Sequence, residues 1–336
     1  MRWAAGLATV VVLLSTSCLP STPAGDSLSQ RLLLTYYFYW YDSQTGGHLQ
    51  PSVLRDHFPP SPDPDWRSLA WQEKQLSDMA EAGIDGALAV YWGFDRPEDE
   101  WSSAGLTVMA GAYRALRAEG RPSPHIGMFL DTSIVNMRDL TSDAGKEWFY
   151  ANFKNFFTRV PRDEWQVVNG RPVAFLFTSD STQAFNQSTF DYVYAHFQAD
   201  FGVRPYIVRE VSWDHPFDGW VDDKRNWDRK TAIVTDNSYL WAASIHGFLN
   251  RGGVAAVGPG FDDSLVPGRA GTVVDRQEGD FYRRAFDAAI ASKKPIVAIE
   301  TWDEMHEGSG ICESTEFGRA YIDITRTEAA RFHSGG

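Results

Sequence analysis

The chain has 336 residues, a formal charge of -13 at pH 7 and two cysteines, Cys18 and Cys312. This charge offers no electrostatic basis for binding nucleic acid, which depends on cationic contacts with phosphate, and it disfavours a polyanionic substrate. Two cysteines predict no disulfide framework. The length fits one α/β barrel after an N-terminal extension and requires no second domain.

The N-terminal segment, residues 1–18, predicts an export signal. Arg2 precedes an apolar run, Ala4–Leu14, which is too short to cross a bilayer and has the proportions of a signal-peptide core. A small residue directly before Cys18 resembles the site at which bacterial lipoproteins are cut and acylated. We therefore expect an exported protein, either lipid-anchored to a membrane at Cys18 or cleaved further on, near Ala24. Residues 19–30, rich in Ser, Thr, Pro and Gly, predict a flexible tether.

The remainder, residues 31–336, carries short apolar runs that predict buried strands, separated by stretches of suitable length for helices. The predicted strands are Leu32–Tyr39, Gly86–Trp92, His125–Leu130, Pro172–Phe177, Pro205–Glu210, Thr231–Thr235, Val254–Gly258 and Pro295–Glu300. Apolar residues at helical spacing predict helices over Trp71–Ala82 and Asp280–Ser292. This alternation predicts an α/β protein with a single (β/α)₈ TIM barrel.

Polar and aromatic residues gather where the predicted strands end, which is where such a barrel carries its functional groups. They are Tyr39, Trp40, Tyr41, Tyr91, Trp92, Asp131, Glu210, Asp236 and Asp262. Each aromatic ring could instead fill the core, and each acid could simply cap a strand end. Together they predict an acidic, aromatic-lined cleft suited to a hydroxyl-rich ligand.

The last predicted strand runs directly into Trp302, Glu304, His306 and Glu307. Two nearby carboxylates can be driven to different pKa values by burial and mutual repulsion, and glycoside cleavage needs that division of labour. Alternatively, both acids begin the next helix, near the positive end of its dipole. The order Glu-Met-His-Glu lacks the two histidines one helical turn apart of a zinc helix, so no metal is expected.

The stretch TWDEMHEGSGICESTEFGRAYI, Thr301–Ile322, resembles the last-strand signature of glycoside hydrolase family 99, the endo-α-mannosidase family, and of related bacterial barrels of unassigned activity. That family has Asn-Glu-Trp-His-Glu-Gly there, so Asp303 stands in place of Asn and Met305 in place of Trp. The resemblance extends to the first, second and seventh strands, through Tyr39–Asp42, Ala82–Gly93 and Gly258–Asp263. The third to sixth strands match only in layout.

The resemblance implies a retaining, endo-acting glycoside hydrolase with an oligo- or polysaccharide substrate and no cofactor. By position, Glu304 matches the glutamate that acts on the sugar 2-hydroxyl, and Glu307 matches the acid/base. Trp302 and His306 join the strand-end residues as expected substrate contacts. Two alternatives stay open: a surface glycan-binding lipoprotein with a hydrolase-like barrel, and a polysaccharide lyase with a Glu or His base.

Overall fold

The computed structural model describes residues 31–43, 64–95, 100–221, 224–227, 230–269 and 271–335. The predicted export signal, the tether and Cys18 lie outside these residues. Among the helices described, none is long and apolar enough to span a bilayer.

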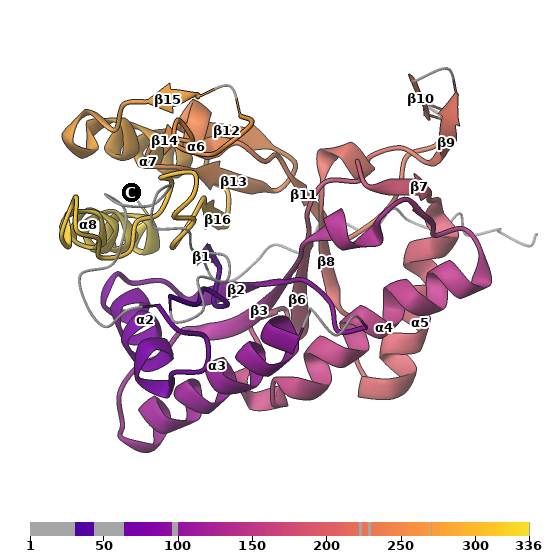
Figure 1. Ribbon diagram of the computed structural model, residues 1–336, viewed down its shortest axis with the longest axis horizontal. Coiled ribbons are helices and arrows are strands. Elements are labelled where there is room, and N and C mark those ends of the chain that lie inside the picture. The colour runs from indigo at the N-terminus through magenta and orange to yellow at the C-terminus, as the bar shows by residue number, and fades with distance from the viewer. Residues whose placement is uncertain are drawn as a thin grey trace, which may run out of the picture.

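A sheet of parallel strands forms the centre of the molecule (Figure 1). Its parallel strands are β1 (Leu32–Tyr37), β2 (Gly86–Tyr91), β3 (His125–Leu130), β6 (Arg171–Leu176), β8 (Tyr206–Glu210), β11 (Asn237–Tyr239), β13 (Val254–Val257) and β16 (Ile296–Ile299). They are ordered as in a (β/α)₈ barrel, with β1 paired to both β2 and β16. β12 (Phe248–Arg251) adds an antiparallel strand beside β13.

The ring of strands is nearly closed. The described ladders run from β11 through β1 to β12, and none joins β11 to β12. A side-chain hydrogen bond bridges this interval, because the Gly253 N–H donates to Asn237 Oδ1 at 2.7 Å. The arrangement is therefore a barrel-like sheet of the TIM type with one ladder replaced by a side-chain contact.

Successive side chains of each strand point to opposite faces of the sheet, which gives one apolar core inside the barrel and another between the barrel and the helices. On β1, Leu34 and Tyr36 face the barrel interior, where they meet Val90 and Phe175. Side chains of opposite parity, such as Tyr37, pack outside the barrel under the helices. Because both faces are covered, the strands read as continuous apolar runs.

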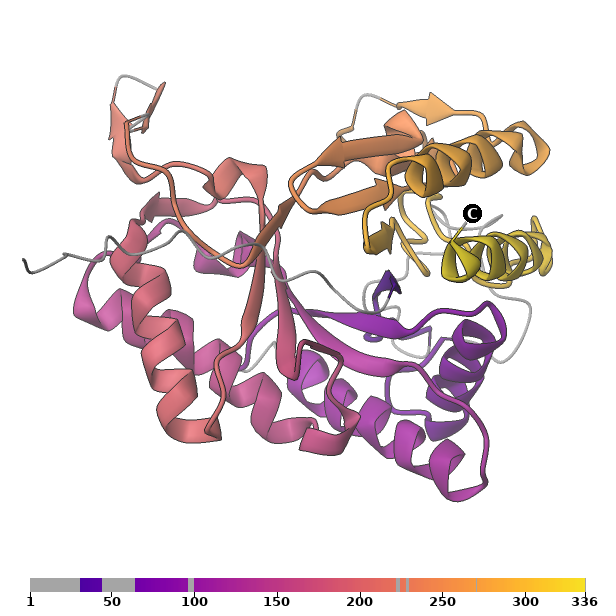
Figure 2. The same ribbon diagram turned by 180° about the vertical axis from the view of Figure 1, so that it is seen from behind.

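The helices wrap the outside of the sheet, with α2 to α5 on one side and α7 and α8 on the other (Figures 1 and 2). They are α2 (Leu69–Glu81), α3 (Glu100–Ala118), α4 (Asp143–Arg159), α5 (Gln187–Phe201), α6 (Ala243–His246), α7 (Asp280–Ala291) and α8 (Ala320–Ser334). Ser68 and Ser142 cap α2 and α4 by accepting backbone N–H bonds, and Asn186 and Thr189 form a capping box at α5.

Short elements decorate the connections. They are η2 (Thr132–Val135), β4 (Arg138–Asp139), η3 (Arg162–Glu164), β5 (Val167–Val168), β7 (Thr182–Ala184), η4 (Val211–Trp213), β9 (Phe217–Val221), β10 (Lys224–Trp227), β14 (Phe261–Asp262), β15 (Val273–Val274) and η5 (Gln277–Gly279). Between β8 and β11, η4 and the β9–β10 hairpin are the elements described, and the hairpin projects away from the body in both views (Figures 1 and 2).

The predicted α/β alternation is confirmed for both predicted helices and for every predicted strand except the sixth, with ends that differ by at most two residues. The prediction of a strand over Thr231–Thr235 is wrong. Those residues make no ladder, and Val234 is 68% exposed. The strand at this place is β11, whose Tyr239 fills the barrel interior.

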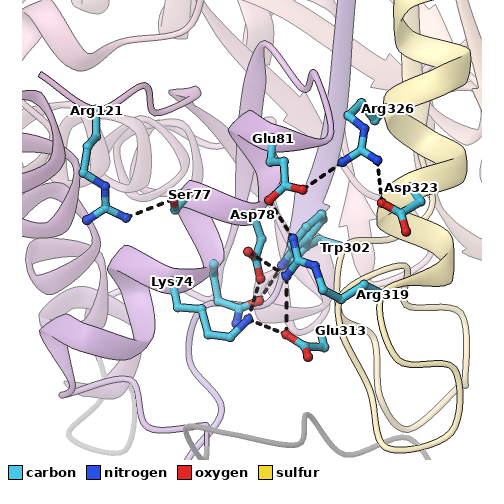
Figure 3. Close-up of polar contacts among 11 residues, drawn as sticks. Lys74, Ser77, Asp78, Glu81, Arg121, Trp302, Glu313, Arg319, Asp323 and Arg326 are labelled. Carbon is cyan, nitrogen blue, oxygen red and sulfur yellow. Dashed lines mark hydrogen bonds and ion pairs between the residues drawn. The ribbon is translucent and has the colours of Figure 1, made fainter.

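An ion-pair network links α8 to α2, the helices that follow the neighbouring strands β16 and β1 (Figure 3). Arg319, next to α8, bonds Asp78 at 3.0 Å and Glu81 at 2.7 Å on α2. Lys74 bridges Asp78 at 2.5 Å and Glu313 at 2.7 Å, which adds the segment after β16. These contacts hold the second half of the loop between β16 and α8 against α2.

Candidate active site

The loop after β16 folds into a compact turn at the C-terminal end of the barrel. It starts with a cis peptide bond between Glu300 and Thr301. The Trp302 N–H donates to Tyr36 O at 2.8 Å, and the Cys312 N–H returns to Trp302 O at 2.8 Å. The middle of the loop, which carries Glu304 and Glu307, is thereby tied to β1 and to itself.

Glu304 is buried and held by two neighbours. Its Oε1 accepts a hydrogen bond from the Tyr41 hydroxyl at 3.2 Å and another from the His306 N–H at 3.0 Å. The His306 Nδ1 lies 3.2 Å from the same oxygen. Burial, and then the charge of Glu304, raise the pKa of Tyr41, so this phenol stays protonated and donates. The structure thus brings together Tyr41, Glu304 and His306, three residues that the sequence predicts for the site.

Glu307 sits in a different environment. Its Oε1 accepts an ion-paired hydrogen bond from Arg269 Nη1 at 2.5 Å. Burial raises the pKa of Glu307, the nearby charge of Glu304 raises it further, and Arg269 opposes both effects. The carboxyl thus has a raised pKa, as an acid that must hold a proton near neutral pH requires.

Asp303 lies under the loop. It is fully buried, and its Oδ1 accepts the Phe38 N–H at 2.8 Å. Burial raises the pKa of Asp303 well above its usual range and so favours the protonated form. A protonated Asp has the shape of an Asn amide, which suits this position, where the family resembled above has Asn.

Met305, the other departure from that family's pattern, is 2% exposed and belongs to the core around the helices. Its N–H points to the Tyr41 hydroxyl at 3.2 Å. The residue at this position therefore packs beneath the loop and presents no face to the barrel mouth.

Aromatic rings surround the mouth. Trp40 contacts Trp92 and Trp101 with ring centroids 6.3 and 5.1 Å apart, and its indole N–H donates to Val90 O at 3.0 Å. Trp92 is half-buried. Trp40 and Trp92 are the predicted aromatic residues that the structure places together here.

The structure adds rings that the sequence reasoning did not single out. Trp241 contacts Tyr36 at 5.1 Å and Phe177 at 5.1 Å between ring centroids, above the interior of the barrel, and Phe38 packs on the same cluster. Phe177 directly follows β6 and Trp241 follows β11 by two residues. Both residues could have been found from their position just past a strand end. For Trp241 this failed because the sixth strand was predicted at Thr231–Thr235 and not at β11.

Glu300 was also missed as a site residue. It is fully buried at the end of β16, and its Oε2 accepts N–H groups from Ala242 at 3.0 Å and Ser244 at 3.5 Å. Burial raises the pKa of Glu300 to about 8. Its carboxyl anchors the start of α6, directly after Trp241.

Asp131, Glu210 and Asp262 have local roles at strand ends. Asp131 accepts the Ser133 N–H at 3.0 Å, Glu210 accepts the Ser212 N–H at 2.7 Å, and Asp262 accepts the Ser264 N–H at 2.9 Å. Each acid thus orders the first turn after its strand, as the alternative interpretation held. Burial raises the pKa of Asp131, and the charge of Glu304 adds to this increase.

Several predicted substrate contacts are corrected. Tyr39, Tyr91 and Trp302 are fully buried between barrel and helices, where they donate to Ser102 O at 2.7 Å, Asn155 Oδ1 at 2.5 Å and Gln75 Oε1 at 2.7 Å respectively. Asp236 precedes β11 and so lies at the opposite end of the barrel, paired with Arg171 at 2.6 Å. These side chains pack the fold and do not reach the mouth.

No group of three or more His, Cys, Asp and Glu side chains within the described ranges is arranged to hold a metal ion.

Solved structures with a similar fold include glycoside hydrolases. The family 99 endo-α-mannosidase of Bacteroides thetaiotaomicron, in complex with BIS-TRIS-propane, shares 14% identity and a TM-score of 0.66 over 90% of this chain and 98% of that chain. A second structure of that enzyme has a TM-score of 0.64 at 14% identity and the same coverage. A glycoside hydrolase-like protein gives 0.64 at 12% identity over 92% of this chain and 97% of its own. At these identities the likeness shows a shared fold.

A search of curated proteins returned no match. A family model, described as a domain of unknown function (DUF5010), matches residues 34–333, from within β1 to within α8. The chain therefore belongs to the DUF5010 family.

Proposed function

We propose that this protein is an exported, endo-acting, retaining glycoside hydrolase that cleaves an α-linked glycan at the mouth of its barrel. One observation carries the proposal: the loop after β16 holds two carboxylates in unlike environments, Glu304 fixed by hydrogen bonds and Glu307 with a raised pKa. Glycoside cleavage uses a pair of carboxyls, one of which holds the proton that the leaving group takes. Half-buried aromatic rings just past the strand ends, those of Trp92, Phe177 and Trp241, suit the apolar faces of sugars.

In this proposal each residue has one task. Glu304, oriented by Tyr41 and His306, assists the sugar 2-hydroxyl in its attack on the anomeric carbon. Glu307 donates a proton to the leaving oxygen and recovers one in the second step. Such substrate assistance is a recognised exception to direct attack by a carboxylate. The assignment rests on the match of these positions to glycoside hydrolase family 99.

A second candidate function, glycan binding without turnover, is favoured by the Arg269 ion pair. Arg269 lies 2.5 Å from Glu307 and 3.7 Å from Asp263 Oδ2. Arg269 favours the ionised form of Glu307, which cannot donate a proton, and so opposes the raised pKa of this carboxyl. In the hydrolase account the entering substrate displaces Arg269 from Glu307, whereas in the binding account the pair persists.

The roles can be separated by the leaving group. We expect Glu304→Gln to abolish cleavage of both natural glycans and glycosyl fluorides. Glu307→Gln should abolish cleavage of glycans but still release fluoride from glycosyl fluorides in the first step, because fluoride leaves without protonation. The second step, in which Glu307 acts as the base, should then be slow. Glu147→Gln, an exposed change on α4, serves as the matched control. Near-normal glycan cleavage by either folded site variant would contradict that residue's role.

We further propose export through residues 1–18, with lipid attachment at Cys18. Cells expressing the full chain should then carry it in the membrane fraction, and Cys18→Ala should release it or block its maturation. An unacylated mature protein that begins near Ala24 would contradict lipid attachment and leave export in place.

A further inference from the structure

A groove of about 500 Å³ lies between the β14–β15 hairpin and the start of α8. Figure 1 shows these elements gathered at the end of the molecule that also holds α7. The volume falls within the roughly 300–1,000 Å³ of small-molecule sites. Gly308, which directly follows Glu307, lines one wall, so the groove borders the loop of the candidate active site.

The groove has an apolar floor and an acidic rim. Phe261, Phe317 and Tyr321 supply aromatic surface. Val273, on the hairpin, lines the groove and is 61% exposed. The rim carries the exposed carboxylates of Asp275, Glu278 and Glu316.

Arg276 gives this groove a buried donor. The side chain is 8% exposed and lies between the rings of Phe317 and Tyr321, 4.5 and 4.4 Å from their centroids. Its Nη2 donates to Gly308 O at 2.6 Å and to Gly310 O at 2.8 Å. Nη1 is buried without an acceptor at hydrogen-bonding geometry among the described residues, although the Tyr321 hydroxyl lies near enough to favour the charged guanidinium. A buried guanidinium N–H without an acceptor is costly, and a ligand oxygen would satisfy it.

The charges select the ligand. An anionic ligand would meet the carboxylates of the rim on a chain with a net charge of -13. A neutral ligand rich in hydroxyls can donate to those carboxylates, accept from Arg276 and lay its C–H faces on the aromatic floor. We propose that the groove is a second saccharide-binding site, taking a neutral part of the glycan outside the bond to be cleaved. This inference deepens the proposed function and rests on it.

Arg276 also connects the groove to catalysis. The guanidinium of Arg276, a residue that lines the groove, holds the carbonyls of Gly308 and Gly310, and the Glu307 carbonyl accepts the Asp262 N–H at 2.7 Å. A saccharide in the groove would therefore contact the residue that braces the catalytic loop. Longer glycans should accordingly bind more tightly than fragments that reach only the barrel mouth.

The test fills the groove without touching the catalytic groups. Ala320→Trp adds a large side chain from α8, and Val273→Trp does so from the hairpin, both at exposed lining positions. Ala330→Trp makes the same change as the first at an exposed position of α8 outside the groove and is the matched control. The proteins are compared in native gels cast with yeast α-mannan, dextran or pullulan, and in kinetics on any of these glycans that the parent cleaves.

We expect at least one glycan to retard the parent and Ala330→Trp, and to retard both groove-filled variants less. On a cleaved polymer, KM should rise about ten-fold in the groove-filled variants with kcat unchanged, while the shortest cleavable fragment should show parent values. The Glu304→Gln/Glu307→Gln variant should remain retarded. A parent that is retarded but cleaves no glycan would refute only the proposed function. Equal retardation of all variants, or none in any gel, overturns the second site.

Discussion

Trp302→Phe tests whether this tryptophan packs the fold or contacts substrate. Its indole is fully buried against α2, and its N–H donates to Gln75 Oε1 at 2.7 Å. Removing the donor leaves a buried acceptor unpaired, which costs about 1–3 kcal/mol, and the smaller ring leaves a void that adds roughly 1 kcal/mol. We therefore expect the free energy of unfolding to fall by about 2–4 kcal/mol in urea titrations followed by fluorescence and circular dichroism.

Trp92→Phe is the matched control for Trp302→Phe. Trp92 is half-buried at the barrel mouth, where its ring lies 6.3 Å from that of Trp40 between centroids. Its replacement should cost about 1 kcal/mol or less of stability and should weaken glycan binding instead. An unchanged free energy of unfolding in Trp302→Phe, combined with weaker glycan binding, would refute the placement of Trp302 in the packing.

Further predictions concern charge. Arg269→Gln should raise the pKa of Glu307 and move the alkaline limb of kcat/KM to higher pH, because it removes the charge that favours the ionised carboxylate. An unmoved limb would contradict this ion pair. Hydrogen bonding to Asp85 raises the pKa of His333 in the folded protein. The stability that this contact contributes is complete below the pKa of the unfolded state and is lost as the pH rises through the pKa of the folded state. His333→Gln should therefore cost more stability at pH 5.5 than at pH 8.5, and equal costs would contradict a raised pKa of His333. Arg319→Met should cost about 1–2 kcal/mol and less in 1 M salt, whereas Arg121→Met, also in Figure 3, should be near neutral.

The order of elements was predictable from sequence because the buried parallel strands are continuous apolar runs with helical stretches between them. β3 matches its prediction residue for residue. β11 was not predictable in this way, since Asn237–Tyr239 is short and polar, and only its pairing with β8 and the burial of Tyr239 define it. The more β-branched run before it, which includes the exposed Val234, attracted the prediction instead.

The direction of side chains limited the prediction of the site. Tyr41, Glu304 and His306 meet as expected, because loops from neighbouring strands converge at one end of a barrel. Tyr91 shares the parity of Ala87 and Ala89, which pack against the helices, so strand alternation could have assigned it to the outside. Arg269 arrives from a long loop, and no local pattern indicated that it pairs with Glu307.

The most direct test of the central claim is a reducing-end assay of the mature protein beside its Glu304→Gln/Glu307→Gln variant, on α-mannans, α-glucans and bacterial capsular glycans. The account predicts that the parent alone releases reducing ends from at least one α-linked glycan, while both proteins show the same cooperative unfolding. Binding of a glycan by both proteins with no release by either would contradict hydrolysis and favour the binding protein.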